Sequence, residues 1–255
     1  MTRTPAGRMP ASDIPESRIR ANDPKSLPGI PVLFENDDIL AVNKPEGIVS
    51  TPAPGGGLPE FIRAGHAEKL YPVHRLDKDV SGVILFAKNA DAHRRLNGEF
   101  ERRAVKKTYV ALTHGVIAKN RGIINAPIRE FGSGRMGVDP KTGKPSVTEF
   151  KVEERFGAFT LVRAFPLTGR RHQIRVHFYH IGHPVVGDLR YGDRAGQKTF
   201  PRLMLHALAV ELPTPSGARL TIEAPLPESF CAVVEDLKEG ASRRGAAVRP
   251  AQERR

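Results

Sequence analysis

The chain has 255 residues, of which 40 are Lys or Arg and 28 are Asp or Glu, so its formal charge is +12. This length suffices for one large domain or two small ones, with a core that needs no cross-links. The single cysteine, Cys231, excludes an internal disulfide and a cysteine-cluster metal site, and the longest apolar run, residues 83–87, is too short to span a bilayer. Because the N-terminus lacks the apolar segment of a secretion signal, we expect a cytoplasmic protein that binds no membrane. The strongly positive charge favours a polyanionic partner.

The two ends of the chain differ in composition from its middle. Residues 1–28 carry five Lys or Arg against three Asp or Glu, and residues 238–255 carry six against two. Both ends are rich in Pro, Ala, Ser and Arg and lack hydrophobic periodicity, so we expect disordered tails around one domain, residues 29–237. The tails either add weak affinity for phosphate or are only solvated ends.

Hydrophobic patterning predicts the elements of the first half in chain order. Short strands are expected over residues 32–35 and 39–43, extended segments over 73–77 and 83–88, a helix capped by Asn89 over 89–103, and a strand over 107–113.

In the second half, a hairpin is expected from the alternating segments 146–155 and 159–165, followed by a helix that opens at 168–169. Strands over 203–212 and 219–223 and a closing helix over 227–237 complete the chain. Many strands, few helices and hairpin connections predict an α+β fold: a largely antiparallel mixed sheet with flanking helices.

The first candidate for chemistry is the segment His74-Arg75-Leu76-Asp77. In an extended chain alternate side chains share a face, which would place Arg75 beside Asp77. An Arg keeps a neighbouring carboxylate ionised, and an ionised, positioned carboxylate is what covalent catalysis at a sugar needs. An ordinary surface ion pair has the same spacing, so the pattern alone leaves both interpretations open.

The second candidate is the basic segment TGRRHQIR, residues 168–175. In the expected helix Arg171 and Arg175 lie four residues apart on one face, where like charges repel unless an anion binds there. The helix N-terminus would add N–H groups that bind anions. A solvated basic face is the alternative interpretation.

A third candidate lies on the predicted strand that begins at residue 107. Lys107 and Tyr109 share one face of this strand, where the cation can hold a phosphate while the ring stacks on a nucleic-acid base. Alternatively, Tyr109 is only a half-buried strand tyrosine.

No pattern in the sequence indicates a cofactor. Four histidines lie within twelve residues, but they match no metal motif and no carboxylate is interleaved before Asp188, so we expect no metal. Glycine signatures for nucleotide cofactors are also missing, since the run PAPGGG at residues 52–57 lacks the Lys and Ser or Thr of a phosphate-binding loop.

Together these segments resemble the RluA-type RNA pseudouridine synthases, over roughly residues 30–230. The resemblance is carried by ordered motifs: ILAVNKPEG (39–47), VHRLDKDVSGVILFA (73–87), KKTYVA (106–111), GKPSVTEF (143–150), LTGRRHQIRVH (167–177), GHPVVGD (182–188) and LHA (205–207). The most specific feature is HRLD followed by Ser-Gly, with TGRRHQIRVH further along the chain.

The resemblance implies an enzyme that isomerises uridine to pseudouridine in structured ribosomal or transfer RNA, without metal or organic cofactor. Asp77 would be the catalytic carboxylate, and Arg75 would displace the target base and occupy its place. Tyr109 would stack on the uracil, and Arg175 would pair with Asp77. Contacts with RNA are expected from further basic or polar side chains: Lys44, Lys107, Arg170, Arg171 and His172.

The chain departs from the family pattern at a few places. Val80 stands where relatives usually have Thr, and Thr51-Pro52 stands where they often have His-Pro. About 30 residues precede the first strand, too few for the S4 RNA-binding domain of many relatives, so target selection is expected within the catalytic domain or its tails. We expect a monomer.

Two other functions fit the same motifs less well. One is a non-catalytic RNA-binding protein or ribosome assembly factor, which would not require the acid at Asp77. The other is an enzyme that cleaves the glycosidic bond without rejoining it, and this enzyme would release free uracil.

Overall fold

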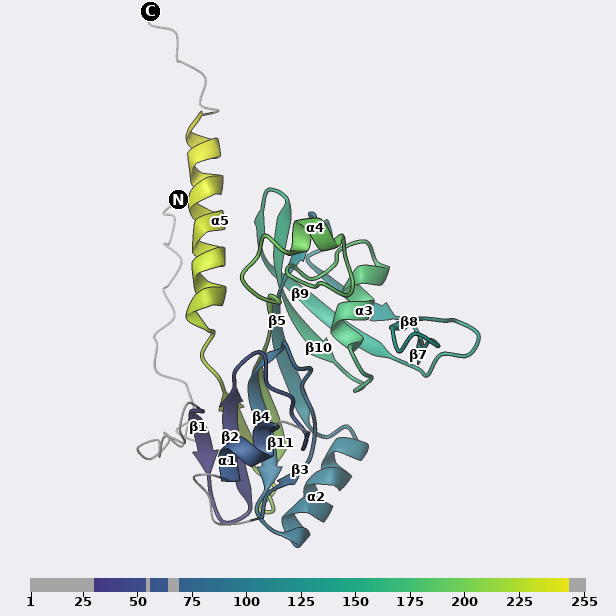
Figure 1. Cartoon of the computed structure of the whole chain (residues 1–255), viewed down its shortest axis with the longest axis vertical. Helices are drawn as coiled ribbons and strands as arrows, with labels where there is room; N and C mark the ends of the chain where they lie inside the picture. The colour runs from purple at the N-terminus through teal and green to yellow at the C-terminus, as the bar shows by residue number, and fades with distance from the viewer. Residues whose placement is uncertain (1–29, 54–55, 64–68, 248–255) are drawn as a thin grey trace, which may run out of the picture.

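The computed structural model describes residues 30–53, 56–63 and 69–247. The predicted N-terminal tail and residues 248–255 lie outside them. A mixed sheet runs through the length of the molecule, with helices on its faces and a small hairpin projecting from one side (Figure 1). Its path is β1-β2-β4-β11-β5-β10-β9-β6, with β3 paired to β4 and β12 paired to β11.

The predicted α+β class is confirmed. The strands are β1 (Val32–Glu35), β2 (Ile39–Lys44), β3 (Tyr71–Pro72), β4 (Ser81–Ala87), β5 (Lys106–His114), β6 (Arg121–Asn125), β7 (Ile128–Glu130), β8 (Met136–Val138), β9 (Val147–Phe156), β10 (Phe159–Pro166), β11 (Leu205–Pro213) and β12 (Arg219–Glu223). The helices are α1 (Leu58–Arg63), α2 (Ala90–Glu101), α3 (Gln173–His180), α4 (Arg194–Gln197) and α5 (Glu228–Ala247).

The strand β4 lies in the interior of the sheet between β2 and β11, and all seven of its residues are buried. Both of its faces are covered, which explains its unbroken apolar sequence. β4 pairs antiparallel with β2 but parallel with β11, the one parallel pair among the described strands. At that pair Gly82 has φ +117°, and a Cβ there would lie 2.2 Å from the Ala207 carbonyl oxygen, so only glycine fits.

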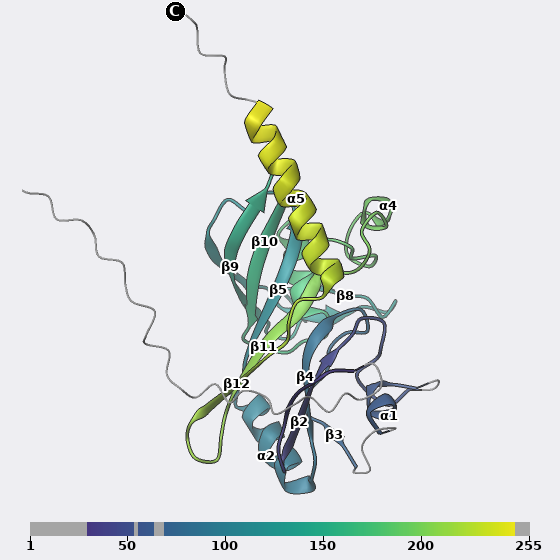
Figure 2. The same cartoon turned by 90° about the vertical axis from the view of Figure 1, so that its left-hand side faces the viewer.

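Helices and loops close the core on both faces of the sheet. Asn89 caps α2 by accepting a hydrogen bond from the Ala92 N–H at 2.8 Å, as the sequence predicts. The first turns of α5 pack Phe230 and Val234 against the β5 side of the sheet, as Figure 2 shows from the side. Among the described helices none is long and apolar enough to cross a membrane.

Two predicted helix boundaries are wrong. The helix expected to open at 168–169 begins only at Gln173, because the buried Gln173 side chain accepts bonds from Thr168 Oγ1 (2.6 Å) and the Arg170 N–H (3.0 Å) and thereby holds the preceding residues as a loop. The closing helix runs ten residues past Leu237, into the segment expected to be a disordered tail. This segment contains Ala, Glu, Lys and Arg and no proline before Pro250, so its composition permits a helix.

Val80, which stands where relatives usually have Thr, packs in the core, and the absence of the Thr hydroxyl leaves no polar group unpaired among the described residues. It is 2% exposed and packs in the apolar cluster that also contains Leu76 and Ile174. No buried polar side-chain atom in the described part of the chain lacks a hydrogen-bond partner. The missing hydroxyl therefore leaves no unpaired group.

Two histidines that are shielded from solvent, one half-buried and one fully buried, predict a loss of stability in mild acid. Burial lowers the pKa of His74 to about 3 and that of His206 to about 4, well below the value of about 6.5 expected in the unfolded chain. Below pH 6.5 the unfolded state therefore binds protons that the native state does not, and each histidine lowers the free energy of unfolding by up to about 1.4 kcal/mol per pH unit.

We expect urea denaturation to show a fall of roughly 2–4 kcal/mol in the free energy of unfolding between pH 6.5 and pH 5. The His206→Gln variant should show a shallower slope. A free energy of unfolding that is constant across this interval would contradict the assignment of neutral histidines.

Candidate active site

The HRLD segment lies in the loop that leads from β3 into β4. Ser50 fixes this loop, because its hydroxyl donates to the Leu76 carbonyl (2.8 Å) and accepts from the Leu76 N–H (3.0 Å). Leu76 is buried, whereas Arg75 is exposed and Asp77 is partly exposed. The expected alternation of faces is thus present, although the loop pairs with no strand beyond Pro72.

Lys44 is not available for the RNA contact that the motif suggested. It is fully buried, and its ammonium donates to the carbonyl oxygens of Pro45 (2.8 Å), Ile48 (2.7 Å) and Lys78 (2.9 Å). Because these three bonds use all its donors, Lys44 tethers the segment after Asp77 to the end of β2. The prediction of an RNA-binding Lys44 is therefore wrong.

Asp77 is held by a buried arginine from α3. Arg175 Nη1 donates to Asp77 Oδ2 at 3.0 Å, which is the pairing that the family resemblance implies. The other side of the same guanidinium binds Asp188 in a bidentate manner, with Nε to Oδ2 at 2.7 Å and Nη2 to Oδ1 at 2.9 Å. Asp188 is fully buried and Arg175 is 5% exposed, so one cation is clamped between two carboxylates.

The electrostatics of this cluster keep the arginine charged. Burial alone lowers the pKa of Arg175, but hydrogen bonds and charge from Asp188 and Asp77 outweigh burial and raise it overall. The guanidinium is therefore a permanent, positioned cation next to Asp77. The spacing argument placed Arg75 in this role, whereas the structure gives it to Arg175.

Arg171 and Arg175 do not share a helix face, contrary to the expectation from their spacing. Arg171 lies in the turn before α3, is exposed, and forms an ion pair with Glu130 at 2.9 Å. His172 precedes the helix with φ +54°, and it lies 3.8 Å from Asp77 Oδ1 through its Nε2. Arg170 lines the cavity next to Tyr109.

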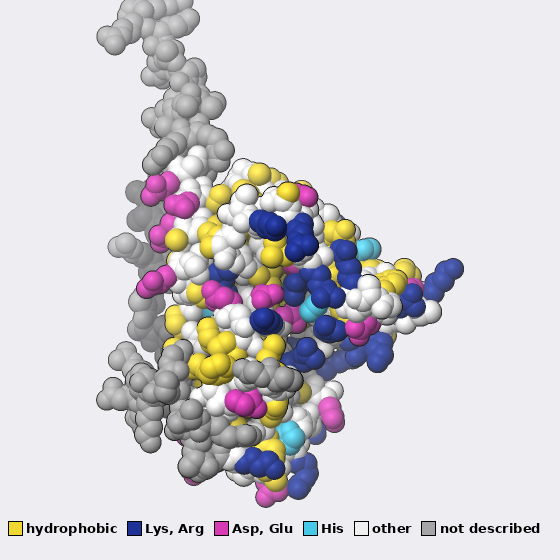
Figure 3. Space-filling model, in the orientation of Figure 1, with side chains coloured by type: hydrophobic (Ala, Val, Ile, Leu, Met, Phe, Trp, Pro, Cys, Tyr) yellow, Lys and Arg dark blue, Asp and Glu magenta, His cyan; other side chains and the backbone are white. Residues whose placement is uncertain are grey.

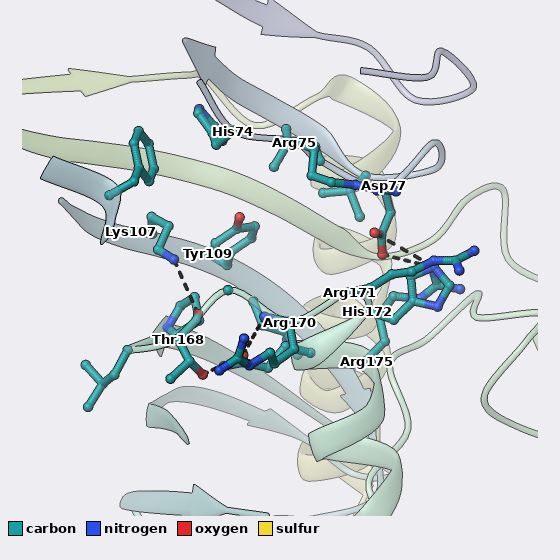
Figure 4. A pocket seen from close by; sticks show the side chains of 18 of the residues that line it. His74, Arg75, Asp77, Lys107, Tyr109, Thr168, Arg170, Arg171, His172 and Arg175 are labelled. Carbon is teal, nitrogen blue, oxygen red and sulfur yellow. Dashed lines mark hydrogen bonds and ion pairs between the residues drawn. The ribbon is translucent and has the colours of Figure 1, made fainter. Parts of the chain in front are cut away.

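Two cavities meet at Asp77. The first, of about 700 Å³, is lined by Tyr109, Lys107 and Arg170, which the sequence analysis singled out. The second, of about 850 Å³, lies toward α4. Both cavities are lined by Arg75, Leu76, Asp77, Arg171, His172 and Arg175, and we call this shared boundary the ridge. Figure 4 shows the first cavity with its labelled side chains.

Lys107 and Tyr109 face the first cavity together, as their spacing on β5 predicts. The Lys107 ammonium donates to the Thr168 carbonyl at 3.3 Å, and burial lowers its pKa to about 8, with the nearby Arg103 charge adding to the effect. Burial also raises the pKa of Tyr109, with the Asp77 charge adding to this rise, so its hydroxyl is neutral. The cavity wall thus offers an uncharged ring beside a cation.

Several residues of the site were not predicted. Asp188 lies in the quoted GHPVVGD motif, but nothing in local spacing connects it with Arg175. Tyr191 and the basic side chains of the second cavity follow that motif without any periodic signal. Within the described residues no group of three or more His, Cys, Asp or Glu could hold a metal ion, and His177 instead contacts Thr148 and the Ala126 carbonyl.

Comparisons with known proteins identify the family. The family model described as RNA pseudouridylate synthase matches residues 38–180. An RNA pseudouridine synthase of Bacillus subtilis is 40% identical over 82% of this chain and 73% of its own length. Ribosomal large subunit pseudouridine synthase C of Escherichia coli is 40% identical over 81% of this chain and 70% of its own length.

A solved structure shows the same fold. The human RNA pseudouridylate synthase domain containing 1 superimposes with a TM-score of 0.69 at 31% identity, covering 85% of this chain and 98% of that chain. This chain therefore belongs to the RluA-type family of RNA pseudouridine synthases, which are isomerases.

Proposed function

We propose that this enzyme isomerises uridine in the RNA of the large ribosomal subunit, with Asp77 as the catalytic carboxylate. The observation that carries the proposal is the pairing of Asp77 with the buried Arg175 on the ridge between two cavities. The choice of RNA is supported by the relatives named ribosomal large subunit pseudouridine synthase C.

The reaction is an isomerisation that needs no added reactant. The bond between ribose C1′ and uracil N1 breaks, the uracil turns, and a bond from C1′ to C5 forms while the hydrogen on C5 leaves as a proton and N1 gains one. Asp77 serves either by attacking the ribose or by taking a proton from it, and both routes begin with an ionised carboxylate. Arg175 orients this carboxylate through the hydrogen bond from its Nη1 to Asp77 Oδ2.

The first cavity suits the detached base. Tyr109 offers a neutral ring on which uracil can stack, and Lys107 lies on the same face of β5. Turning a nucleotide out of stacked RNA costs a few kcal/mol. In the proposal Arg75, exposed on the ridge beside Asp77, fills the place that the base leaves.

The second cavity suits the flanking strand. Arg190, Arg194 and Lys198 line it without a carboxylate partner among the described residues. Figure 3 shows Lys and Arg side chains gathered on this face of the molecule, which carries α4 and α3. We place the phosphates next to the target nucleotide against these cations, which offset the cost of flipping.

Removing the positive charges that line the second cavity should weaken RNA binding in a salt-dependent manner. For Arg194→Gln combined with Lys198→Gln, we expect the slope of log K against log salt to decrease by about 1.5, because two phosphate contacts are lost. Filter binding at several salt concentrations measures the slope.

The matched control is Lys119→Gln with Arg121→Gln, which removes two exposed charges outside both cavities. The control should keep the wild-type slope. Equal slopes for the two double variants would refute the proposed path of the strand.

The proposed substrate is tested by tritium release from RNA labelled at uridine C5. Unmodified ribosomal and transfer RNA are assayed separately with the wild type. We expect release from ribosomal RNA. Release from transfer RNA alone would overturn the proposed substrate, and tight binding to both without release would favour an assembly factor.

A further inference from the structure

The structure contains a chain of hydrogen bonds that the proposed reaction does not yet use. It starts at the N–H of Met136 in β8, which donates to the Tyr191 hydroxyl at 3.2 Å. The same hydroxyl lies 2.7 Å from His172 Nδ1. His172 Nε2 in turn lies 3.8 Å from Asp77 Oδ1, the carboxylate oxygen that Arg175 does not bind.

We propose that Tyr191 and His172 are positioning residues for Asp77: Tyr191 fixes the ring of His172 so that its Nε2–H faces the free carboxylate oxygen. The proposal rests on Asp77 acting as the catalytic carboxylate. It concerns neither residue's contact with the substrate.

The hydrogen bonds of the Tyr191 hydroxyl favour one neutral tautomer of His172. A phenol hydroxyl that accepts from the Met136 N–H has its own proton left to donate, and His172 Nδ1 is the acceptor at 2.7 Å. A neutral imidazole that accepts at Nδ1 carries its hydrogen at Nε2. This hydrogen is therefore on the side of the ring that faces Asp77.

The ring is also neutral in this setting. Burial lowers the pKa of His172 to about 4, and the charges of Arg175, Arg171 and Arg190 add to the lowering while Asp77 opposes it. A neutral ring points its Nε2–H at Asp77 across 3.8 Å without placing a second full charge beside Arg175.

The backbone of His172 indicates that its placement has a cost. Its φ of +54° lies in the left-handed region, which is uncommon for residues other than glycine, although His adopts it more often than most. Among the described residues with side chains only Arg103 shares this feature. Such strain persists where surrounding contacts enforce it, and the buried Tyr191 hydroxyl supplies one of these contacts.

Tyr191 contacts the residues that surround Asp77. It is 1% exposed, and its ring lies 5.2 Å from the guanidinium of Arg175 and 5.3 Å from that of Arg135 at the projecting hairpin. Its N–H donates to Asp188 Oδ1 at 3.1 Å. One buried ring therefore contacts the cation that holds one Asp77 oxygen and the histidine that faces the other.

The consequence for Asp77 concerns rotation of its carboxylate. Arg175 holds Oδ2, and without a group opposite Oδ1 the carboxylate can turn about this single contact. In the proposal the His172 N–H, 3.8 Å from Oδ1, limits this rotation from the other side of the carboxylate. Losing the fixed orientation of the carboxylate should slow the chemical step and leave the affinity for substrate unchanged.

The kinetic test uses Tyr191→Phe, which removes one oxygen atom. We expect kcat to fall about tenfold, the effect of one lost orienting hydrogen bond, with KM unchanged. His172→Asn, a residue that tolerates the left-handed backbone, should lower kcat at least as much, and the double variant should be no slower than the slower single variant.

The matched control is Tyr179→Phe. Tyr179 lies on α3 with its ring 6.2 Å from that of Tyr191, but it is 47% exposed, and its hydroxyl forms no side-chain hydrogen bond with any described residue. This variant should retain wild-type kcat. The proposal would be overturned if Tyr191→Phe kept the wild-type kcat. It would also be overturned if kcat/KM fell only because KM rose.

A second measurement does not depend on activity. Nitrogen-15 NMR of histidine distinguishes the two neutral tautomers, and the His172→Asn spectrum identifies the signal of His172. We expect the Nε2–H form in the wild type and a mixture of forms in Tyr191→Phe. A wild-type His172 protonated at Nδ1 would refute the proposal even if Tyr191→Phe were slow.

These outcomes are separable from failure of the proposed function. If the wild type shows no turnover, or if an Asp77 variant retains it, the proposed function fails. If Asp77 proves essential while Tyr191→Phe is normal in rate and tautomer, only the positioning role fails.

Discussion

Replacing Asp77 with Asn is expected to reduce turnover by at least about 10⁴-fold while changing the affinity for RNA by less than about threefold. Asn has the shape of Asp and keeps an oxygen that can accept from Arg175 at the position now 3.0 Å away. It lacks the negative charge that either proposed route requires. The cations that we propose to bind RNA, in both cavities, are untouched.

Single-turnover kinetics and filter binding measure these two quantities. The matched control is Asp79→Asn, which removes a charge from an exposed residue two positions away that lines only the second cavity. It should remain active within a few fold. Substantial turnover by Asp77→Asn would show that another group performs the chemistry.

Replacing Arg175 with Gln should abolish turnover and also destabilise the fold, by about 3–5 kcal/mol. The destabilisation arises because Asp188 is fully buried and loses both bonds from the guanidinium, at 2.7 and 2.9 Å. Urea denaturation at pH 7 measures the loss of stability.

A double variant separates stability from catalysis. In Arg175→Gln with Asp188→Asn the buried carboxylate is removed, while the new amide oxygen can still accept from the backbone N–H groups of Arg190 and Tyr191. We expect more than half of the stability to return without any return of turnover. Recovery of turnover together with stability would mean that Arg175 acts only through the fold.

Local patterns predicted the parts of the fold that depend on local physics. The β9–β10 hairpin alternates along both strands and pairs antiparallel, and α2 begins after the Asn89 cap. The strands β6, β7 and β8 were missed because they have only five, three and three residues, too few to show a periodic pattern, and pair at a sheet edge or in a separate hairpin. Their position depends on the tertiary fold rather than on their own sequence.

In the site, too, local patterns predict some features and the tertiary fold determines the others. That Lys107 and Tyr109 share a face follows from strand periodicity alone. The pairing of Asp77 with Arg175 joins residues 98 positions apart, so no local rule could produce it, and only the family resemblance supplied it. Lys44 was misjudged because its charge suggested a surface role, whereas carbonyl oxygens of two loops enclose its ammonium.

The most direct test of the account is the product formed from large-subunit ribosomal RNA. Unmodified RNA is incubated with the wild type or with Asp77→Asn, digested to nucleosides and separated by chromatography, with free uracil measured before digestion. The account predicts that the wild type converts uridine to pseudouridine without releasing uracil, and that Asp77→Asn forms none. Free uracil as the product, or equal amounts of pseudouridine from both proteins, would contradict it.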